Sequence, residues 1–199
     1  MSSRHDELLD AALAEWSKVG YAEVGVKEIT ARASVSHGTF YNYFDNRRQL
    51  LDVLVEREVT PFLEMFDVLE REMHRPVTEE SLREVITAGT AKVLNGVLAR
   101  PDSISFIALE VPGIDDRALR RDIELFREAG RRAGRILDNA VADGVIDRSL
   151  NIEFAGQVWI SAIFSLVVPF LADGREIGDV DRLAAEYAEI ALHGVSLSN

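Results

Sequence analysis

The sequence contains no cysteine among its 199 residues, which excludes a disulfide framework and a thiolate metal site. Its histidines are scattered and lack the spacing of metal ligands; they are His5, His37, His74 and His193. Nucleotide-binding and hydrolase motifs are missing as well, since there is no Walker loop, G-x-G-x-x-G, G-x-S-x-G or H-E-x-x-H. We therefore predict no catalytic residue, no metal site, no cofactor and no enzymatic activity.

Strand patterns and a cleavable leader are also lacking. The first ten residues, MSSRHDELLD, are charged and contain no apolar core of a signal peptide, so we expect a cytoplasmic protein. Apolar residues recur at helical spacing along the chain, and no segment shows convincing period-two alternation. Hydrophobic residues make up 47% and charged residues 28%, as in soluble globular proteins. These features predict an all-α fold.

Basic residues are outnumbered by acidic ones, with 22 Lys or Arg against 34 Asp or Glu, so the formal net charge is −12. Residues 1–50 carry six Lys or Arg and seven Asp or Glu, so nearly all of the excess negative charge belongs to the rest of the chain. Four basic residues of the first fifty cluster near one motif; they are Lys27, Arg32, Arg47 and Arg48. An acidic body with a locally basic end argues against a protein that coats nucleic acid generally, and it is compatible with docking on DNA in one orientation.

That motif is the segment from Ala33 to Arg48, ASVSHGTFYNYFDNRR. Ser36 is a good helix N-cap, and Phe40 and Phe44 lie four residues apart, so both fall on one helix face and can dock on a core. Upstream, Val26, Ile29 and Ala33 repeat at helical spacing, and three residues separate the two helices. This is the connection length of a helix-turn-helix.

The segment GYAEVGVKEITARASVSHGTFYNYFDNRRQLL resembles the DNA-binding region of the tetracycline-repressor (TetR) family of bacterial regulators. The resemblance runs from near Leu8 to about Leu54, and its core is Ser36-x-Gly-Thr-Phe-Tyr-x-Tyr-Phe44. Ser34 stands where the family usually has glycine, so it must tolerate a left-handed or otherwise unusual conformation at a cost of about 1 kcal/mol. Arg47 replaces the usual lysine and keeps its charge, and Trp16, which we expect in the core, replaces the commoner phenylalanine.

The resemblance implies a homodimeric, sequence-specific DNA-binding regulator, most simply a repressor that a small apolar or amphipathic ligand releases from a palindromic double-stranded operator. Residues 1–48 would form a three-helix DNA-binding head, and residues 49–199 a larger helical body for effector binding and dimerisation. The reading helix would place four residues at base edges: Ser36, His37, Gly38 and Thr39. Phosphates would be held by Tyr41, Asn42, Tyr43 and Arg47, with help from Lys27 and Arg32.

The pattern of the remaining residues predicts further helices. A helix over residues 5–19 buries a stripe of Leu9, Ala12, Leu13, Trp16 and Val19. A helix from about Arg47 should bend or break around Thr60 and Pro61. Residues 101–111 form a short apolar helix, and Asp115 or Asp116 opens a long one with Leu119, Ile123 and Phe126 inward. In that long helix we predict that Gly130 and Gly134 allow a neighbouring helix to pack closely, with room for a bound molecule as the alternative, and that its arginines form a solvated face.

Residues 154–172 carry no charge for nineteen positions. A membrane span is disfavoured, because polar residues and Pro169 interrupt the run and no basic loop adjoins it. We predict instead a helix buried between its own subunit and a partner subunit. We assign its small stripe, with one face of the last helix, to the dimer interface: Ala155, Val158, Ala162, Ser165, Pro169, Leu183, Tyr187 and Ile190. The bulky stripe of Trp159, Ile163, Leu166 and Phe170 would then fill the core, and the reverse assignment is the alternative.

The effector is expected to contact surplus aromatic and soft side chains, for each of which core packing is the competing interpretation: Phe62, Met65, Phe66, Phe106, Phe126, Trp159 and Phe164. Two alternatives to the whole interpretation stay open. One is a helical small-molecule-binding protein whose head no longer binds DNA, and the other is a membrane-associated protein. Neither the effector nor the operator can be named from the sequence.

Overall fold

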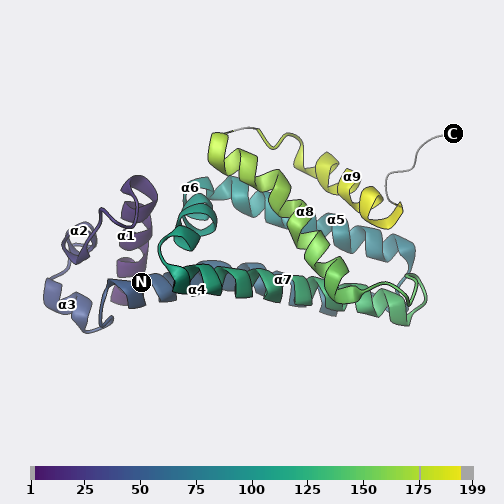
Figure 1. The fold of residues 1–199 in the computed structure, drawn as a ribbon, viewed down its shortest axis with the longest axis horizontal. Coiled ribbons are helices and arrows are strands. Elements are labelled where there is room, and N and C mark those ends of the chain that lie inside the picture. Colours follow the sequence, from purple (N-terminus) through teal and green to yellow (C-terminus); the bar gives the residue numbers. More distant parts are fainter. Residues whose placement is uncertain (1–2, 175, 194–199) are drawn as a thin grey trace. The chain divides into compact units, whose positions relative to one another are not determined.

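The computed structural model describes residues 3–174 and 176–193, and within these ranges the chain is helical, without strands. The predicted all-α fold is therefore confirmed. The helices, drawn in Figure 1, are α1 (Arg4–Val19), α2 (Val26–Arg32), α3 (His37–Tyr41), α4 (Arg47–Glu72), α5 (Glu79–Ala99), α6 (Pro101–Ser105), α7 (Asp116–Ala142), α8 (Ile152–Asp173) and α9 (Val180–His193). A π-helical turn (Phe106–Glu110) and a 3-10 turn (Val111–Gly113) follow α6.

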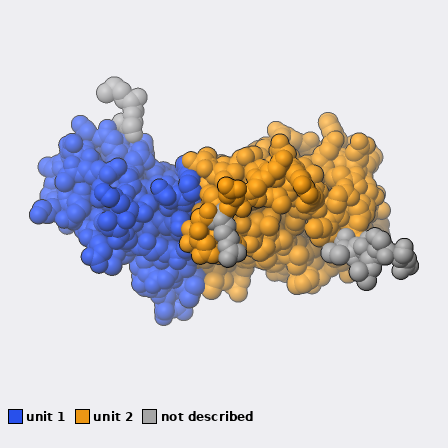
Figure 2. All heavy atoms as spheres, turned by 90° about the horizontal axis from the view of Figure 1, so that it is seen from above, with its two compact units in different colours: residues 1–61, 100–120 blue, residues 62–99, 121–199 orange. Residues whose placement is uncertain are grey.

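Contacts divide the chain into two compact units. The first unit comprises residues 1–61 and 100–120, and the second comprises residues 62–99 and 121–199 (Figure 2, blue and orange). The segment 100–120 therefore packs with the N-terminal helices although residues 62–99 separate it from them in sequence. The functional boundary that we predict after residue 48 concerns DNA and effector binding, and it stays a prediction.

Trp16 is part of the core of the first unit and contacts two other aromatic rings there. Its side chain is fully buried in α1, where it stacks on Phe106 with ring centroids 5.9 Å apart and meets Tyr21 at 5.1 Å. The predicted core position of Trp16 is thus confirmed. Val19, the last residue of the predicted stripe, is 50% exposed, because α1 ends at this residue and Gly20 turns the chain away with φ 91°.

Helix α4 runs without interruption through Pro61, so the predicted break is absent. Proline removes a single backbone hydrogen bond, and the buried side chains of Leu63 and Phe66 hold the helix on the far side of it. The boundary between the two compact units nevertheless falls at this proline.

The predicted helix over residues 101–111 is instead three short pieces of different geometry. Residues Pro101–Ser105 are α-helical, Phe106–Glu110 form a π-turn, and Val111–Gly113 form a 3-10 turn. The burial of Phe106, Ile107 and Val111 explains the apolar pattern. Hydrophobic spacing cannot distinguish these helix types over so few residues, because their periods differ too little.

The first turns of α7 are more exposed than we predict. Leu119 and Ile123 are exposed, so their assignment to an inward stripe is wrong, whereas Phe126 is half-buried. Both exposed residues lie close to residue 120, where the chain passes from one compact unit to the other. Helical spacing identifies an apolar stripe, but it does not specify where along the stripe a core covers it.

In the second unit α9 lies along α5 (Figure 1), and α8 packs bulky side chains inward. Trp159 and Ile163 are buried as predicted, and the Trp159 ring meets Phe66 of α4 edge-on at 6.0 Å. Phe170 is half-buried, and Leu166 is 36% exposed, so the assignment of Leu166 to the core of its own subunit is wrong. Position 166 falls between the buried face of α8 and its outer face.

By length and composition α8 is able to cross a membrane, but this property is shared by core helices of soluble proteins. Five of its residues are buried inside the second unit: Gly156, Trp159, Ile160, Ile163 and Val167. This burial is weak support for a core helix over a span.

Three glycines let α7 and α8 cross at close range. A Cβ atom on Gly156 would collide with the carbonyl oxygen of Gly130, and one on Gly130 would collide with the Gln157 side chain. At Gly134 an added Cβ would lie 3.3 Å from the carbonyl oxygen of Ile152. The prediction that Gly130 and Gly134 serve helix packing is confirmed.

We expect Gly156→Ala to lower the free energy of unfolding by about 1–3 kcal/mol, because the new methyl group overpacks a backbone-to-backbone contact. Gly96→Ala is the matched control: it lies in α5 with no atom within 4 Å of the added Cβ, and it should raise the free energy by about 0.5–1 kcal/mol. Urea titrations of both variants measure these changes. Equal stability of the two variants would contradict the close crossing.

Candidate DNA-binding surface

Helix α2 begins with a cap in which the Glu28 side chain reaches back to the Gly25 backbone. The Gly25 N–H donates to the Glu28 carboxylate over 3.0 Å, which satisfies a backbone donor at the helix start. The N–H groups of Glu28 itself and of Gly25 lower the pKa of the Glu28 carboxyl, since both stabilise its charged form. The carboxylate therefore helps α2 to begin at Val26.

The turn between α2 and α3 contains the left-handed residue that the sequence implies. Ser34 has φ 55°, the one positive φ of a non-glycine residue in the described chain. Two backbone hydrogen bonds close the turn, from Ser34 N–H to the Ala31 carbonyl at 3.2 Å and from Val35 N–H to the Thr30 carbonyl at 3.0 Å. The left-handed conformation of Ser34 agrees with the expected unusual backbone at this position. The Cβ atom of serine makes this conformation less favourable than it would be for glycine.

Ser36 caps α3 as predicted. Its hydroxyl accepts a hydrogen bond from the Thr39 N–H at 3.0 Å and also lies 2.9 Å from the Thr39 hydroxyl. Behind the cap, Phe40 is fully buried and Phe44 is 2% exposed, and their rings meet at 5.7 Å. The cap determines where α3 begins, and the two phenylalanines determine which side of it faces inward.

His37 links the two helices of the motif. Its Nδ1 lies 3.3 Å from the Thr30 hydroxyl of α2, and its ring meets Tyr41 edge-on at 6.3 Å. The residue is nevertheless exposed. The His37 side chain is therefore held at the N-terminus of α3 while part of it stays open to solvent.

Most of the predicted DNA-binding residues are open to solvent. Tyr41 is 56% exposed and Tyr43 is 43% exposed, although both are large aromatic residues. Also exposed are Lys27, Arg32, Ser36, His37, Gly38 and Asn42, and Thr39 is half-buried. We call these nine residues the reading surface.

Arg47 makes contacts inside the protein that the sequence does not predict. Its guanidinium donates to the carbonyl oxygens of Tyr21 and Val24, and its Cζ atom lies 4.1 Å from the centre of the Tyr21 ring. These contacts tie the start of α4 to the loop before α2. The Nη1 group of Arg47 is directed into the protein, so we propose that Arg47 also positions the loop before α2, and its contact with phosphate stays a prediction. Sequence reasoning overlooked Tyr21, whose signal was an aromatic residue directly after the Gly20 helix stop.

The other arginines near the motif are paired within the first unit. Arg32 donates to Glu15 at 2.8 Å, and Arg48 is paired with Asp52 and Asp115. Lys27 differs from them, since it forms no ion pair with any residue that the structure describes. The Lys27 ammonium group is exposed and is not neutralised by an ion pair within the part of the chain that the structure describes.

The predicted effector-contacting residues fall into separate groups. In the second unit Phe62, Phe66 and Trp159 form a chain of edge-on contacts, and Phe126 meets Phe164 at 6.0 Å. Phe164 is 39% exposed and Met65 is half-buried. Phe106 belongs to the first unit and stacks on Trp16, so it does not join the other six.

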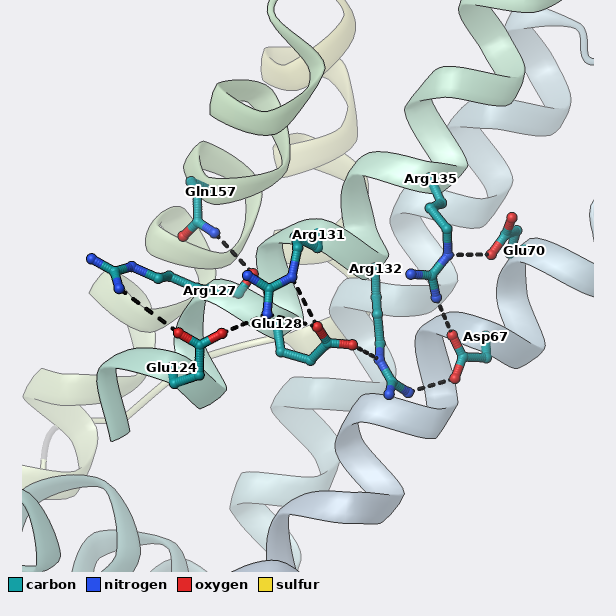
Figure 3. A network of polar contacts seen from close by, with 9 residues as sticks. All are labelled: Asp67, Glu70, Glu124, Arg127, Glu128, Arg131, Arg132, Arg135 and Gln157. Atoms are coloured by element: carbon teal, nitrogen blue, oxygen red, sulfur yellow. Dashed lines mark hydrogen bonds and ion pairs between the residues drawn. The ribbon is translucent and has the colours of Figure 1, made fainter. Parts of the chain in front are cut away.

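Most of the arginines of α7 are solvated, as we predict, and they also form a network of ion pairs. Figure 3 shows Arg131 between Glu124 and Glu128, at 2.7 and 2.9 Å. Arg132 and Arg135 reach across to α4, where both meet Asp67 and Arg135 also meets Glu70 at 3.0 Å. Acidic side chains on α7 and α4 alternate with these arginines and pair with them. Because their charge is balanced by these carboxylates, the arginines do not form a second basic surface for nucleic acid.

Comparisons with known proteins agree with the motif. The model of the bacterial regulatory proteins of the tetR family matches residues 8–54. The transcriptional regulator AcuR of Cereibacter sphaeroides is 38% identical over 66 residues, which span 33% of this chain and 30% of AcuR. The fatty acid metabolism regulator protein of Bacillus subtilis (strain 168) is 22% identical over 193 residues, covering 96% of this chain and 95% of that protein.

Solved structures resemble the whole fold. FadR from Bacillus halodurans, a fatty acid degradation regulator, superposes with a TM-score of 0.82 at 18% identity, covering 98% of this chain and 97% of that chain. FadR of Bacillus subtilis, solved in complex with stearoyl-CoA, gives a TM-score of 0.81 at 20% identity, with 96% and 100% covered. At these identities the likeness establishes the fold.

We expect Ser34→Gly to raise the free energy of unfolding by up to about 1 kcal/mol, because glycine adopts positive φ without the serine Cβ penalty. Ser34 is exposed, so little packing is lost. The matched control is Ser34→Val, in which a β-branched residue should destabilise the same turn. Thermal unfolding of both variants measures the difference, and a stabilising valine would contradict the left-handed turn.

Proposed function

Because the chain belongs to the tetR family of bacterial regulatory proteins, we propose that it is a cytoplasmic repressor whose reading surface binds a palindromic operator. The observation that carries this proposal is the exposed N-terminus of α3, held by its Ser36 cap and by the buried Phe40 and Phe44. Two such helices in a dimer would enter successive major grooves about 34–36 Å apart, or a multiple of that spacing.

Roles on the reading surface follow from position. Residues at the N-terminus of a recognition helix approach base edges, so we assign Ser36, His37, Gly38 and Thr39 to them. Tyr41, Asn42 and Tyr43 lie at or beyond the end of α3 and would donate to phosphates, with Lys27 and Arg32 adding positive charge. The acidic remainder of the chain would disfavour other orientations on DNA.

A substitution at Gly38 tests DNA binding without disturbing the fold. It is exposed, its φ is not positive, and an added Cβ would meet nothing closer than the Ser36 hydroxyl at 3.7 Å. The protein itself therefore has room for a larger residue. An approaching DNA backbone or base edge would need the space that glycine leaves.

We expect Gly38→Ala to leave the free energy of unfolding unchanged or to raise it by up to about 1 kcal/mol, through the higher helix propensity of alanine. Operator affinity should fall about tenfold or more, since the methyl group occupies space at the DNA. Mobility shifts on a duplex selected from random DNA measure this, with Gly96→Ala as the control that leaves affinity unchanged. Unaltered affinity would contradict our orientation of α3, and absence of any selected site would favour the alternative of a head that no longer binds DNA.

For the effector we propose a long-chain acyl-CoA that binds in the second unit. Support comes from FadR of Bacillus subtilis, which was solved with stearoyl-CoA, and from the aromatic groups around Phe66, Trp159 and Phe126. An acyl chain is a flexible apolar ligand of the kind that aromatic and methionine side chains accommodate. Its binding would lower operator affinity.

Stearoyl-CoA should weaken operator binding, and by linkage the operator should weaken stearoyl-CoA binding by the same factor, typically about 5–150-fold. Calorimetric titration of stearoyl-CoA with and without operator DNA, beside mobility shifts with and without stearoyl-CoA, measures both factors. CoA without an acyl chain is the control ligand. Tight binding of stearoyl-CoA at unchanged operator affinity would contradict the coupling.

The dimer that we propose is formed by α8 and α9 of each subunit. Val158 is 47% exposed and Ile190 is 53% exposed in the single chain, and Ser165 is exposed as well. The other proposed interface residues are half-buried: Ala155, Ala162, Pro169, Leu183 and Tyr187. Burial already raises the pKa of Tyr187 to about 12. Pairing of these faces would give an intermolecular four-helix bundle.

A further inference from the structure

Thr30 of α2 is a buried polar residue that contacts the reading surface. It is 4% exposed, and its hydroxyl lies against two groups. The hydroxyl donates to the Lys27 carbonyl oxygen over 3.1 Å and also lies 3.3 Å from the Nδ1 atom of His37. His37 is exposed and belongs to α3. A buried side chain of one helix therefore touches one ring nitrogen of an exposed imidazole on the next helix.

The Thr30 hydroxyl has a single hydrogen to share between these two contacts. When it donates to the Lys27 carbonyl, it can only accept from His37, so Nδ1 must carry the ring hydrogen. When it donates to Nδ1 instead, the contact with the Lys27 carbonyl contains no hydrogen. The first arrangement makes two hydrogen bonds and the second makes one. The first is therefore favoured, because each hydrogen bond within the protein adds a favourable contribution.

The hydrogen on Nδ1 determines what the rest of the His37 ring offers to a partner. A neutral imidazole carries one hydrogen on its two nitrogens, so Nε2 is then an acceptor. Among the described residues His37 forms its hydrogen bond through Nδ1 alone, which leaves Nε2 available. The ring also meets Tyr41 edge-on at 6.3 Å, which restricts how it can turn. The exposed imidazole thus presents an acceptor, and an acceptor requires a donor on its partner.

We propose that Thr30 is a positioning residue that holds neutral His37 with its hydrogen on Nδ1, so that Nε2 accepts a hydrogen bond from the amino group of an adenine or a cytosine. This inference rests on the proposed function, which assigns His37 to a base edge. In the major groove adenine N6 and cytosine N4 are donors, whereas guanine offers the acceptors N7 and O6. An acceptor on His37 would face those guanine atoms without a hydrogen between them. Thr30 would therefore influence base choice although it is too buried to reach the DNA itself.

The tautomer is measured in the free protein by NMR of the isotope-labelled full chain, since the ring nitrogen shifts distinguish a protonated nitrogen from an unprotonated one. At about pH 8 a histidine side chain in a model peptide is neutral. His37→Asn identifies the His37 signals by their loss. We expect Nδ1 to carry the hydrogen in the unmodified protein.

Two substitutions at Thr30 separate its hydroxyl from its packing. Thr30→Val removes the hydroxyl at nearly the same size, so the His37 signals should move towards the form with the hydrogen on Nε2. Thr30→Ser keeps the hydroxyl and loses a methyl group, so the hydrogen should stay on Nδ1. Thermal unfolding shows that both variants remain folded. A Thr30→Val protein that keeps the hydrogen on Nδ1 would overturn the role of Thr30.

The base contact is measured on a duplex selected from random DNA. His37→Ala should lose discrimination at one base pair, which locates the contact. At that pair one duplex carries the adenine or cytosine without its amino group, and a second carries the purine with carbon in place of N7. Loss of the amino group should weaken binding by the unmodified protein about fivefold and should not weaken binding by His37→Ala further. Replacement of N7 should affect both proteins alike, because effects without a His37 contact appear in both.

Thr30→Val should bind the selected duplex about fivefold more weakly and should lose most of the distinction between duplexes with and without the amino group. Thr30→Ser should keep that distinction. A purely structural role of Thr30 would instead lower the affinity for both duplexes by the same factor, and this result would overturn the proposal.

A hydrogen on Nε2 in the unmodified protein would overturn the proposal, and so would a His37-dependent loss on replacement of N7 rather than of the amino group. Both results would leave operator binding itself intact. Absence of any selected site would overturn the base contact together with the proposed function. The NMR measurement distinguishes that failure from a wrong tautomer, because it requires no DNA.

Discussion

Burial of Phe40 and Phe44 determines which side of α3 can meet DNA. The two rings lie four residues apart, and each removes its apolar surface from water almost completely, a gain of roughly 2–3 kcal/mol per side chain. With that face held inward, Gly38 and Tyr41 have to point outward. The reading surface therefore depends on core packing as much as on its own polar residues. Ser36 completes the constraint, since its cap fixes the residue at which the short helix begins.

Several arginines are paired with other groups of the protein in both units. In the second unit the arginines of α7 are taken up by Glu124, Glu128, Asp67 and Glu70, so a basic stripe in the sequence yields a local network (Figure 3). In the first unit Arg32, Arg47 and Arg48 are also engaged, by carboxylates or by backbone carbonyls. Arginine suits such positions because its planar group donates to several acceptors at once. Lys27 forms no ion pair with any residue that the structure describes, and Tyr41 and Tyr43 are exposed.

Residues 100–120 belong by packing to the first unit, and by chain connection they continue into α5 and α7. Phe106 stacks on Trp16, Glu110 accepts from the Tyr21 N–H, and Arg100 pairs with the buried Glu58 of α4 at 2.7 Å. A buried carboxylate such as Glu58 needs its partner, because an uncompensated charge is costly inside a protein.

The sequence by itself determined the helical fold class, the helix-turn-helix, the Ser36 cap and the packing role of Gly130 and Gly134. Each of these follows from local rules: the period of apolar residues, the hydrogen bonds at a helix start and the steric limits on φ. Tertiary structure alone decided that Arg47 faces Tyr21 and Val24, that Phe106 stacks on Trp16, and that Leu166 stays exposed. It also decided that Pro61 lies inside an unbroken α4. These outcomes depend on partners distant in sequence, and neither charge nor helical spacing specifies which distant groups a side chain will meet.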